Sequence, residues 1–348
     1  MQRFLRSGCL VALLTLGLMG CDAQTALKEL AQQAQSRSAQ QRPAGPSAPA
    51  DMRPPVAAYP NSPATGYPVT PVGTSRAPTI KIASFNIQVF GVSKMKKQPV
   101  MDVLTQVIRR FDLVAIQEVR STEDTIVPNF VQLINANGAR YDFVIGPRMG
   151  RTNSKEQYVF IFDTARIEVD PRSVYTVPDP QDLFQREPLV ARFRVRDVPP
   201  NQAFTFTLVD IHTEPDEATA ELNAMADVFV SVQQNGSGED DVIVLGDLNA
   251  DEYHLGRLGQ LPNIAHVVTG VPTNTRRNKM YDNIVFDRRA TVEYTGRWGV
   301  LDLKAEFGLS EAQALEVSDH FPVWAEFSAY EGFNGAPVAT RPGELPRY

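Results

Sequence analysis

Runs of apolar residues predict a β-rich domain between residues 79 and 329. Residues 242–245 are four apolar residues that end at Gly246, and such a run is typical of a strand buried on both faces. Similar runs predict further strands at residues 80–90, 112–119, 143–146, 158–162, 189–195, 204–211, 282–286 and 321–327. The strands are separated by Gly-, Pro- and polar-rich segments, as expected for a compact sheet structure.

Apolar residues at helical spacing predict helices at residues 101–110, 129–137 and 218–232. In the third, Leu222, Met225 and Phe229 fall on one stripe. Helices and strands interleave, which favours an α/β fold with two packed mixed β-sheets flanked by helices. The pattern alone leaves a single mixed sheet as an alternative.

Polar side chains border these runs at the predicted strand ends. Asp247 and Asn249 follow one run together, and an acid with an amide suits a metal-assisted phosphate site. An Asx-type turn is the alternative for this pair alone. The same arrangement recurs at Asn86, Glu118, His212, Asp282, Asp319 and His320. If these ends converge, they form a cluster of carboxylates, amides and imidazoles, whereas His254 and His266 lie in irregular sequence and are given no role.

The N-terminal part has the composition of an export signal and a tether. Residues 10–19 are apolar but too few to span a membrane comfortably, and Leu18-Met19-Gly20-Cys21 resembles the lipobox of bacterial lipoproteins. This resemblance implies a signal peptide at 1–21, lipid attachment to Cys21, and an anchor on the periplasmic or extracellular side of the bacterial cell envelope. An ordinary secretory signal is the alternative. Residues 22–78, rich first in Ala and Gln and then in Pro, predict a disordered tether, and residues 330–348 a flexible tail.

The amino-acid composition argues against a disulfide-stabilised domain and against broad, nonspecific attraction to nucleic acid. The chain has 348 residues, 43% of them hydrophobic, and a formal net charge of -6. Both cysteines, Cys9 and Cys21, precede the folded part, so no disulfide framework is available to it. The negative charge argues against broad, nonspecific attraction to nucleic acid, but it is compatible with a local basic strip.

Five segments together resemble the endonuclease/exonuclease/phosphatase superfamily, most closely its deoxyribonuclease I branch. They are residues 81–91, 113–120, 184–188, 246–251 and 318–323. Gly-Asp-Leu-Asn at 246–249 and Ser-Asp-His at 318–320 mark the superfamily, while Gln-Glu-Val-Arg at 117–120 and Arg-Glu-Pro at 186–188 point to the branch. The resemblance implies a four-layered sandwich that cleaves DNA with Mg²⁺ or Mn²⁺ and little sequence preference. We expect the protein to be a monomer.

The resemblance also implies a role for each residue at a matching position. Glu118 would be the main cation ligand, with Asn86 and Asp319 completing the site, since Mg²⁺ prefers oxygen donors. Asp247 would orient the attacking water or a second cation, and Asn249 would hold a phosphate oxygen.

Two histidine–carboxylate pairs are implied, His212 with Glu156 and His320 with Asp282. A carboxylate beside a histidine fixes its tautomer and raises its pKa, so that the imidazole can exchange a proton near neutral pH. Which histidine acts as base stays open. Three arginines are expected on the DNA side: Arg186 at a phosphate, Arg120 toward the minor groove, and Arg151.

Some positions depart from the deoxyribonuclease pattern. Gln88 stands where an arginine is usual, and Ser154 stands where a groove-stacking tyrosine is usual. A structural Ca²⁺ site is a further expectation, at Asp179, Asp182 and Glu187. Two other functions remain open: a sphingomyelinase-like or phosphoinositide-type phosphodiesterase on the same site plan, and a binding module that has lost catalysis.

Overall fold

The computed structural model describes residues 78–332. The predicted signal peptide, the lipidation at Cys21, the tether through residue 77 and the tail from residue 333 lie outside the described residues. Within residues 78–332, no helix combines the length and the apolar character needed to cross a membrane.

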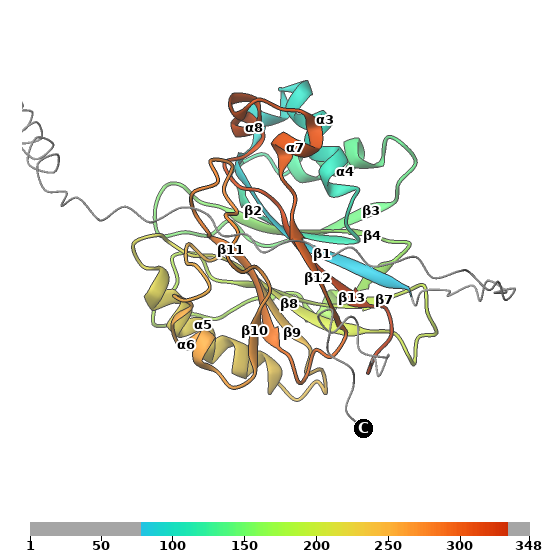
Figure 1. Ribbon diagram of the computed structural model, residues 1–348, viewed down its shortest axis with the longest axis vertical. Coiled ribbons are helices and arrows are strands. Elements are labelled where there is room, and N and C mark those ends of the chain that lie inside the picture. The colour runs from blue at the N-terminus through green and yellow to red at the C-terminus, as the bar shows by residue number, and fades with distance from the viewer. Residues whose placement is uncertain (1–77, 333–348) are drawn as a thin grey trace, which may run out of the picture. The chain divides into compact units, whose positions relative to one another are not determined.

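The first sheet has six strands in the order β12-β13-β1-β2-β4-β3 (Figure 1). Its strands are β1 (Thr79–Phe90), β2 (Leu113–Val119), β3 (Tyr141–Ile145), β4 (Gln157–Asp163), β12 (Tyr294–Val300) and β13 (Val323–Ser328). Strand β1 lies at the centre, parallel to β2 and antiparallel to β13. The β1–β2 register shifts between Asn86 and Phe90, which marks a bulge at the end of β1.

The second sheet has seven strands, in the order β10-β11-β9-β8-β7-β5 with β6 paired to β7. Its strands are β5 (Ile167–Val169), β6 (Tyr175–Thr176), β7 (Leu189–Val195), β8 (Thr205–His212), β9 (Val242–Asp247), β10 (Ile264–His266) and β11 (Asp282–Asp287). Strands β8 and β9 run parallel, so their carboxyl ends meet at the same edge.

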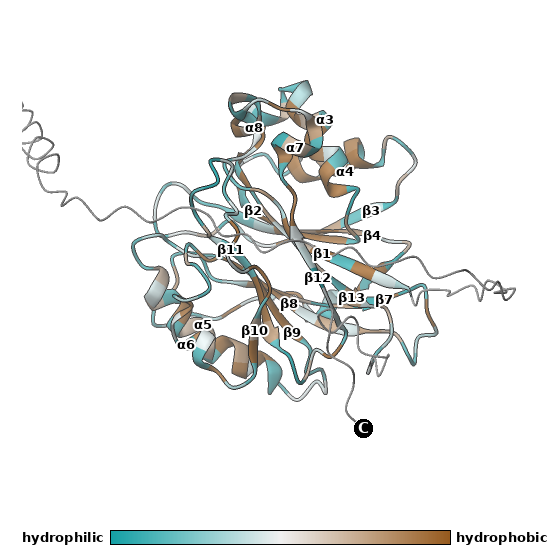
Figure 2. Ribbon diagram, viewed as in Figure 1, coloured by the Kyte–Doolittle hydropathy of each residue, from teal (hydrophilic) through white to brown (hydrophobic). Residues whose placement is uncertain are grey.

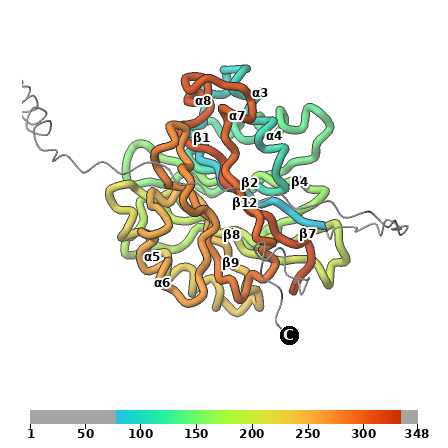
Figure 3. Tube along the Cα trace, in the orientation of Figure 1, coloured from blue at the N-terminus to red at the C-terminus, as the bar shows by residue number. Residues whose placement is uncertain are grey.

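Helices cover the outer face of each sheet and complete four layers (Figures 1 and 3). Those on the first sheet are α2 (Val92–Met95), α3 (Gln98–Ile108), α4 (Ile126–Asn135), α7 (Leu303–Phe307) and α8 (Glu311–Val317). Those on the second are α5 (Ala218–Gln233) and α6 (Gly256–Gln260), and a short 3-10 helix covers Pro171–Ser173. This architecture confirms the predicted sandwich and excludes the single mixed sheet.

The layer between the sheets is the largest apolar core, and Figure 2 shows hydrophobic residues along its strands. Phe160 of β4 packs edge-on against Phe193 of β7, with 5.4 Å between ring centroids. Phe204, just before β8, stacks on Phe327 of β13 in the first sheet at 5.9 Å. These rings are essentially buried, so contacts between the sheets hold the two halves of the sandwich together.

The predicted strands and helices are all present, with ends displaced by a few residues. Helix α3 begins at Gln98 rather than residue 101, because Pro99 occupies its first turn, where a proline costs no hydrogen bond. Helix α4 likewise begins earlier, at Ile126. Four strands, β5, β6, β10 and β12, and the short helices α2, α6, α7 and α8 were not anticipated. They are short or half-exposed and carry little hydrophobic periodicity.

Candidate active site

The layer between the sheets turns from apolar to polar at one end of the sandwich. In β8, Phe206 and Leu208 face this layer, and alternation places Asp210 and His212 on the same side. In β9 the alternation that points Leu245 inward does the same for Asp247. Strand β11 follows this rule at Asp282. Ordinary strand geometry therefore gathers three acids and the imidazole of His212 at one edge, and Glu156 joins them from the residue before β4.

Gly246 allows β8 and β9 to approach closely at this edge. Its φ is +150°, and a Cβ atom there would lie 1.8 Å from the carbonyl oxygen of Ile211. Any other residue would therefore displace one of the two strands. The resulting register sets His212 beside Asp247, and β11 sets Asp282 beside Asp247 from the other side.

Asp247 is the point at which the polar residues meet. Its Oδ2 atom lies 3.5 Å from Nε2 of His212 and 3.4 Å from Nε2 of His320. The same oxygen accepts a hydrogen bond of 3.0 Å from Nδ2 of Asn86, which is on the other sheet. The two histidines are 108 positions apart in the chain, and both lie close to the same carboxylate oxygen.

Each histidine is held from behind by a second carboxylate. Nδ1 of His212 is 2.9 Å from Oε2 of Glu156, and Nδ1 of His320 is 2.8 Å from Oδ2 of Asp282. Burial acts to lower the pKa of His320, but Asp282 and Asp247 outweigh it and raise that pKa well above its usual value. Burial is likewise outweighed at His212, where Glu156 and Asp247 raise the pKa. Both imidazoles can therefore carry a proton at neutral pH.

Three oxygen donors gather next to this pair of histidines. Nδ2 of Asn86 donates to Oε1 of Glu118 at 3.2 Å, and the backbone N–H of Val89 donates to Oε2 at 2.8 Å. Burial and the nearby charge of Glu118 help to raise the pKa of Asp319. Oδ1 of Asn86 and Oδ1 of Asp319 are buried without a hydrogen-bond partner among the described residues. Unsatisfied oxygens of this kind fit a hard cation.

The backbone around Glu118 is strained. Glu118 has φ +63° and Val89, in the bulge of β1, has φ +51°, both in the left-handed region that non-glycine residues seldom adopt. Such conformations cost about 1–3 kcal/mol each and persist where the surrounding structure holds them. The bulge aims the N–H of Val89 at the Glu118 carboxylate, so the strain is linked directly to the position of this side chain.

The three predicted DNA-side arginines all form ion pairs. Nη2 of Arg120 is 2.8 Å from Glu156 and 3.3 Å from Glu118. Arg186 is nearly buried: its Nε donates to the carbonyl oxygen of His212 at 3.0 Å, and its Nη2 has no hydrogen-bond partner. Arg120 and Arg186 line a surface hollow of about 430 Å³ beside the Glu156–His212 pair. Arg151 lies at the surface, paired with acids at 2.8 and 2.9 Å.

Asn249 and the expected Ca²⁺ ligands are placed differently from the histidine–carboxylate pairs. Strand β9 ends at Asp247, and Asn249 has φ +45° in an Asx-type turn, its N–H donating to Oδ1 of Asp247 at 3.1 Å. Its Nδ2 donates to the carbonyl oxygen of Thr213. The Asx turn and the strand-end pair therefore coexist. Of the acids expected to bind Ca²⁺, Asp182 pairs with Arg151, and the described residues show no cluster of close ligand atoms that joins it to Asp179 and Glu187.

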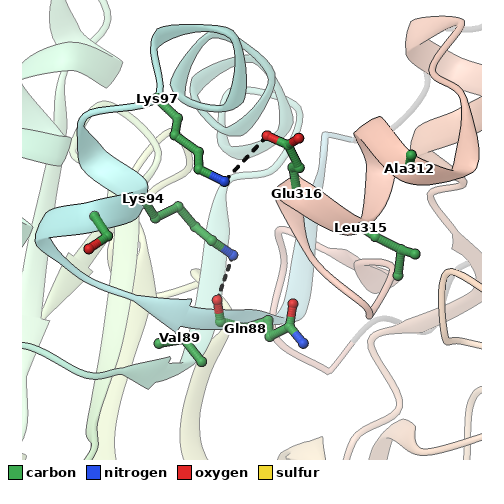
Figure 4. A pocket seen from close by; sticks show the side chains of 8 residues that line it. Gln88, Val89, Lys94, Lys97, Ala312, Leu315 and Glu316 are labelled. Carbon is green, nitrogen blue, oxygen red and sulfur yellow. Dashed lines mark hydrogen bonds and ion pairs between the residues drawn. The ribbon is translucent and has the colours of Figure 1, made fainter.

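Two residues next to the site, one partly and one fully buried, were not anticipated from the sequence. Nζ of Lys94 donates to the carbonyl oxygens of Gln88, at 2.5 Å, and Val317, at 2.7 Å; Figure 4 shows its contact with Gln88. It thereby joins the end of β1 to the segment that precedes Asp319. Asp210 is fully buried between the sheets and accepts a hydrogen bond of 2.6 Å from Gln117. No motif singled out either residue, because neither lies at a strand end.

Comparison with known proteins supports the family resemblance of the sequence. A model of the Endonuclease/Exonuclease/phosphatase family matches residues 83–320. The chain belongs to the endonuclease/exonuclease/phosphatase family. This match spans the strand-end residues of the site from Asn86 to His320, so the polar cluster lies within the part of the chain that defines family membership.

Similar family members include deoxyribonuclease gamma of Rattus norvegicus, which is 30% identical over 275 residues, covering 74% of this chain and 87% of the relative. Deoxyribonuclease-1-like 1 of Sus scrofa is 34% identical over 264 residues, covering 72% and 82%. The human Nocturnin catalytic domain, with bound sulfate, superposes with a TM-score of 0.51 at 15% identity, covering 73% of this chain and 94% of that one. This last likeness shows the shared fold.

Proposed function

We propose that the protein is a metal-dependent endonuclease that hydrolyses DNA phosphodiester bonds with little sequence preference. The observation that carries the proposal is the convergence of two histidines on Asp247, each with a carboxylate behind it. Two imidazoles and an acid can deprotonate a water and protonate a leaving oxygen on opposite sides of one phosphate. The similarity to proteins named deoxyribonucleases supports DNA as the substrate.

In this proposal the histidines exchange protons at Nε2. Their Nδ1 atoms are hydrogen-bonded to Glu156 and Asp282, which fixes the tautomer and stabilises the imidazolium. Asp247, within 3.5 Å of both Nε2 atoms, orients the attacking water between them. The near symmetry of the two pairs leaves open which histidine takes the first proton.

Glu118, Asn86 and Asp319 would hold a Mg²⁺ or Mn²⁺ ion. The unsatisfied oxygens of Asn86 and Asp319 support this assignment, as does the hydrogen bond that places the Glu118 carboxylate beside Asn86. A bound ion would supply positive charge next to a phosphate oxygen and so stabilise charge that develops during cleavage. The ligand atoms of Asp247, Asp282 and His320 also lie within 4.8 Å of one another, which supports Asp247 as a ligand of a second cation.

Arg186 is the best placed of the three arginines to contact DNA. Arg186 lines the hollow beside Glu156, and its buried Nη2 has no hydrogen-bond partner among the described residues. Nη2 lies 3.6 Å from Oε2 of Glu214, so a phosphate oxygen would bind it in place of this longer ion pair. Arg120 would approach the minor groove next to Ser154, whose hydroxyl it contacts at 3.1 Å. Arg151 would have to exchange its two surface ion pairs for a phosphate, and such exposed pairs are worth little.

The test is cleavage by the full chain. Supercoiled plasmid DNA, RNA and sphingomyelin vesicles are each incubated with Mg²⁺ and then with EDTA. We expect EDTA-sensitive nicking of the plasmid. Lipid hydrolysis without nicking would support a lipid phosphodiesterase instead, and no turnover on any substrate would support a binding module.

We further propose that the protein is a monomer attached to the bacterial envelope through lipid on Cys21, with the catalytic domain held away from the membrane by residues 22–78. The lipobox-like sequence before Cys21 and the proline-rich composition that follows support this localisation. Labelling with a radioactive fatty acid should mark the wild-type chain and spare Cys21→Ser. Equal labelling of both chains would refute lipidation at this cysteine.

A further inference from the structure

Three carboxylates converge at the end of the sandwich opposite the candidate active site. Asp241 immediately precedes β9, whose other end carries Asp247. At about 3.3 Å per residue, the six steps along the chain from Asp241 to Asp247 place the two acids about 20 Å apart. Glu293 precedes β12 and Glu331 follows β13, so the cluster draws on both sheets.

The geometry of this cluster is that of a cation site. One ligand oxygen from each of Asp241, Glu293 and Glu331 lies within 4.8 Å of the other two. Two oxygens that each lie about 2.4 Å from a common Ca²⁺ ion can be at most about 4.8 Å apart. The three carboxylates therefore already stand at the spacing that a shared ion requires.

The burial of Asp241 is independent evidence that this cluster binds a cation. Its side chain is 1% exposed, and its Oδ1 atom is buried with no hydrogen-bond partner. Within residues 78–332, no lysine or arginine forms an ion pair with it. Burial, followed by the charges of Glu293, Glu331 and Glu239, raises the pKa of Asp241 to about 9. A buried acid among other acids is costly unless a cation compensates it.

Backbone contacts hold the three residues in place before any ion arrives. Thr207 N–H donates to the carbonyl oxygen of Asp241 at 2.8 Å, and Ser328 N–H donates to that of Glu293 at 2.8 Å. Oε2 of Glu331 accepts from the N–H of Thr205, in the second sheet, at 2.9 Å. The site is thus preorganised by both sheets, which lowers the cost of binding.

We propose that Asp241, Glu293 and Glu331 bind a Ca²⁺ ion that links the two sheets and the segment after β13. Ca²⁺ accepts irregular sets of six to eight oxygens and fills vacant positions with water, which suits one exposed and two buried carboxylates. Mg²⁺ demands a more regular octahedron. This site is separate from the cleavage chemistry, so it stands whether or not the chain cuts DNA.

The test is Ca²⁺-dependent thermal unfolding of the full chain. All measurements use a Glu118→Gln background, so that cation binding at the active site contributes little. At a Ca²⁺ concentration 100 times the Kd, the unfolding temperature should rise by about 5–10 °C over its value in EDTA. In the same background Asp241→Asn should abolish the rise. Asp240→Asn, which alters the exposed neighbour, should keep it.

Folding is checked separately in EDTA. There Asp241→Asn should unfold at the same temperature as its parent or higher, because it replaces a buried acid that lies among other acids with a neutral side chain of similar size. Absence of a Ca²⁺-dependent rise in the parent, or an undiminished rise in Asp241→Asn, would overturn the proposal. Loss of the rise in Asp240→Asn as well would overturn the choice of these three ligands.

Discussion

Asp247→Asn is the substitution that tests the proposed mechanism most directly. It keeps the volume and one acceptor oxygen of the side chain but removes the negative charge that both imidazoles face. That charge contributes to the raised pKa of His212 and of His320. The variant therefore distinguishes the effect of the charge on Asp247 from the effect of its size and shape.

The expected loss follows from the distances. Two unit charges 3.5 Å apart attract each other by about 5 kcal/mol at an effective dielectric constant of about 20. A hydrogen bond from a protonated imidazole to the Asn oxygen recovers about 1 kcal/mol. The remaining ~4 kcal/mol corresponds to a loss of about 10³-fold in the cleavage rate. In the variant both imidazoles should also lose their protons at lower pH.

The assay is the conversion of supercoiled plasmid to nicked circles under single-turnover conditions with Mg²⁺, repeated from pH 5 to pH 9. Asp251→Asn is the matched control. It breaks another Asp–His pair, in the neighbouring loop, where the 74% exposed side chain of His254 lies 2.6 Å from Asp251. The control should cleave within about twofold of wild type. If a folded Asp247→Asn variant cleaves within tenfold of wild type, the charge on Asp247 has no catalytic role and the reasoning fails.

Three further predictions concern the residues around this centre. His212→Ala and His320→Ala should each lower the single-turnover nicking rate by about 10²–10⁴-fold, since each removes a proton-transfer group; wild-type rate in either variant would exclude that histidine. Lys94→Met should raise the Mg²⁺ concentration needed for half-maximal nicking. It should also lower the free energy of unfolding in urea by about 1–3 kcal/mol, because the carbonyl oxygens of Gln88 and Val317 lose their donor. An unchanged Mg²⁺ requirement would show that Lys94 does not position the cation ligands. Burial raises the pKa of Asp210 well above its unfolded value, so the folded state holds this proton more tightly and wild-type stability falls as pH rises above about 4. Asp210→Asn lacks this titration, and its unfolding temperature relative to wild type should increase from pH 4 to pH 8; a constant difference would mean that Asp210 is ionised in both states.

The positions of the candidate site residues at strand ends could be predicted from the sequence because they follow strand periodicity. A continuous apolar run followed by a polar residue identifies a strand and its end at once, as at Leu245 and Asp247. Parallel neighbours then bring such ends together, as β8 and β9 do for His212 and Asp247. The family resemblance added the order of these ends, which periodicity alone does not give.

Other features could not be predicted because they depend on contacts between distant segments. Lys94 lies on a four-residue helix with an ordinary surface-like sequence, and only the fold shows that its ammonium reaches Val317, 223 positions away. Asp210 interrupts an apolar strand without any signal that Gln117 faces it from the other sheet. Strand β12 contains Gly296 and Gly299 and is largely half-exposed, so its pairing with β13 leaves no alternation in the sequence.

The two ends of the sandwich differ in how the charge of a buried carboxylate is compensated. At the candidate active site Glu156 lies between His212, Arg120 and Arg186, and these partners outweigh burial and lower its pKa. The ionised form of Glu156 is favoured because the protein supplies the opposite charge. At the far end Asp241 has acidic neighbours, and its pKa moves upward instead. A charge that the fold itself does not neutralise must either take up a proton or attract a cation from solution. The two ends should therefore respond differently to EDTA: removal of Mg²⁺ should stop cleavage, whereas removal of Ca²⁺ should mainly lower the unfolding temperature.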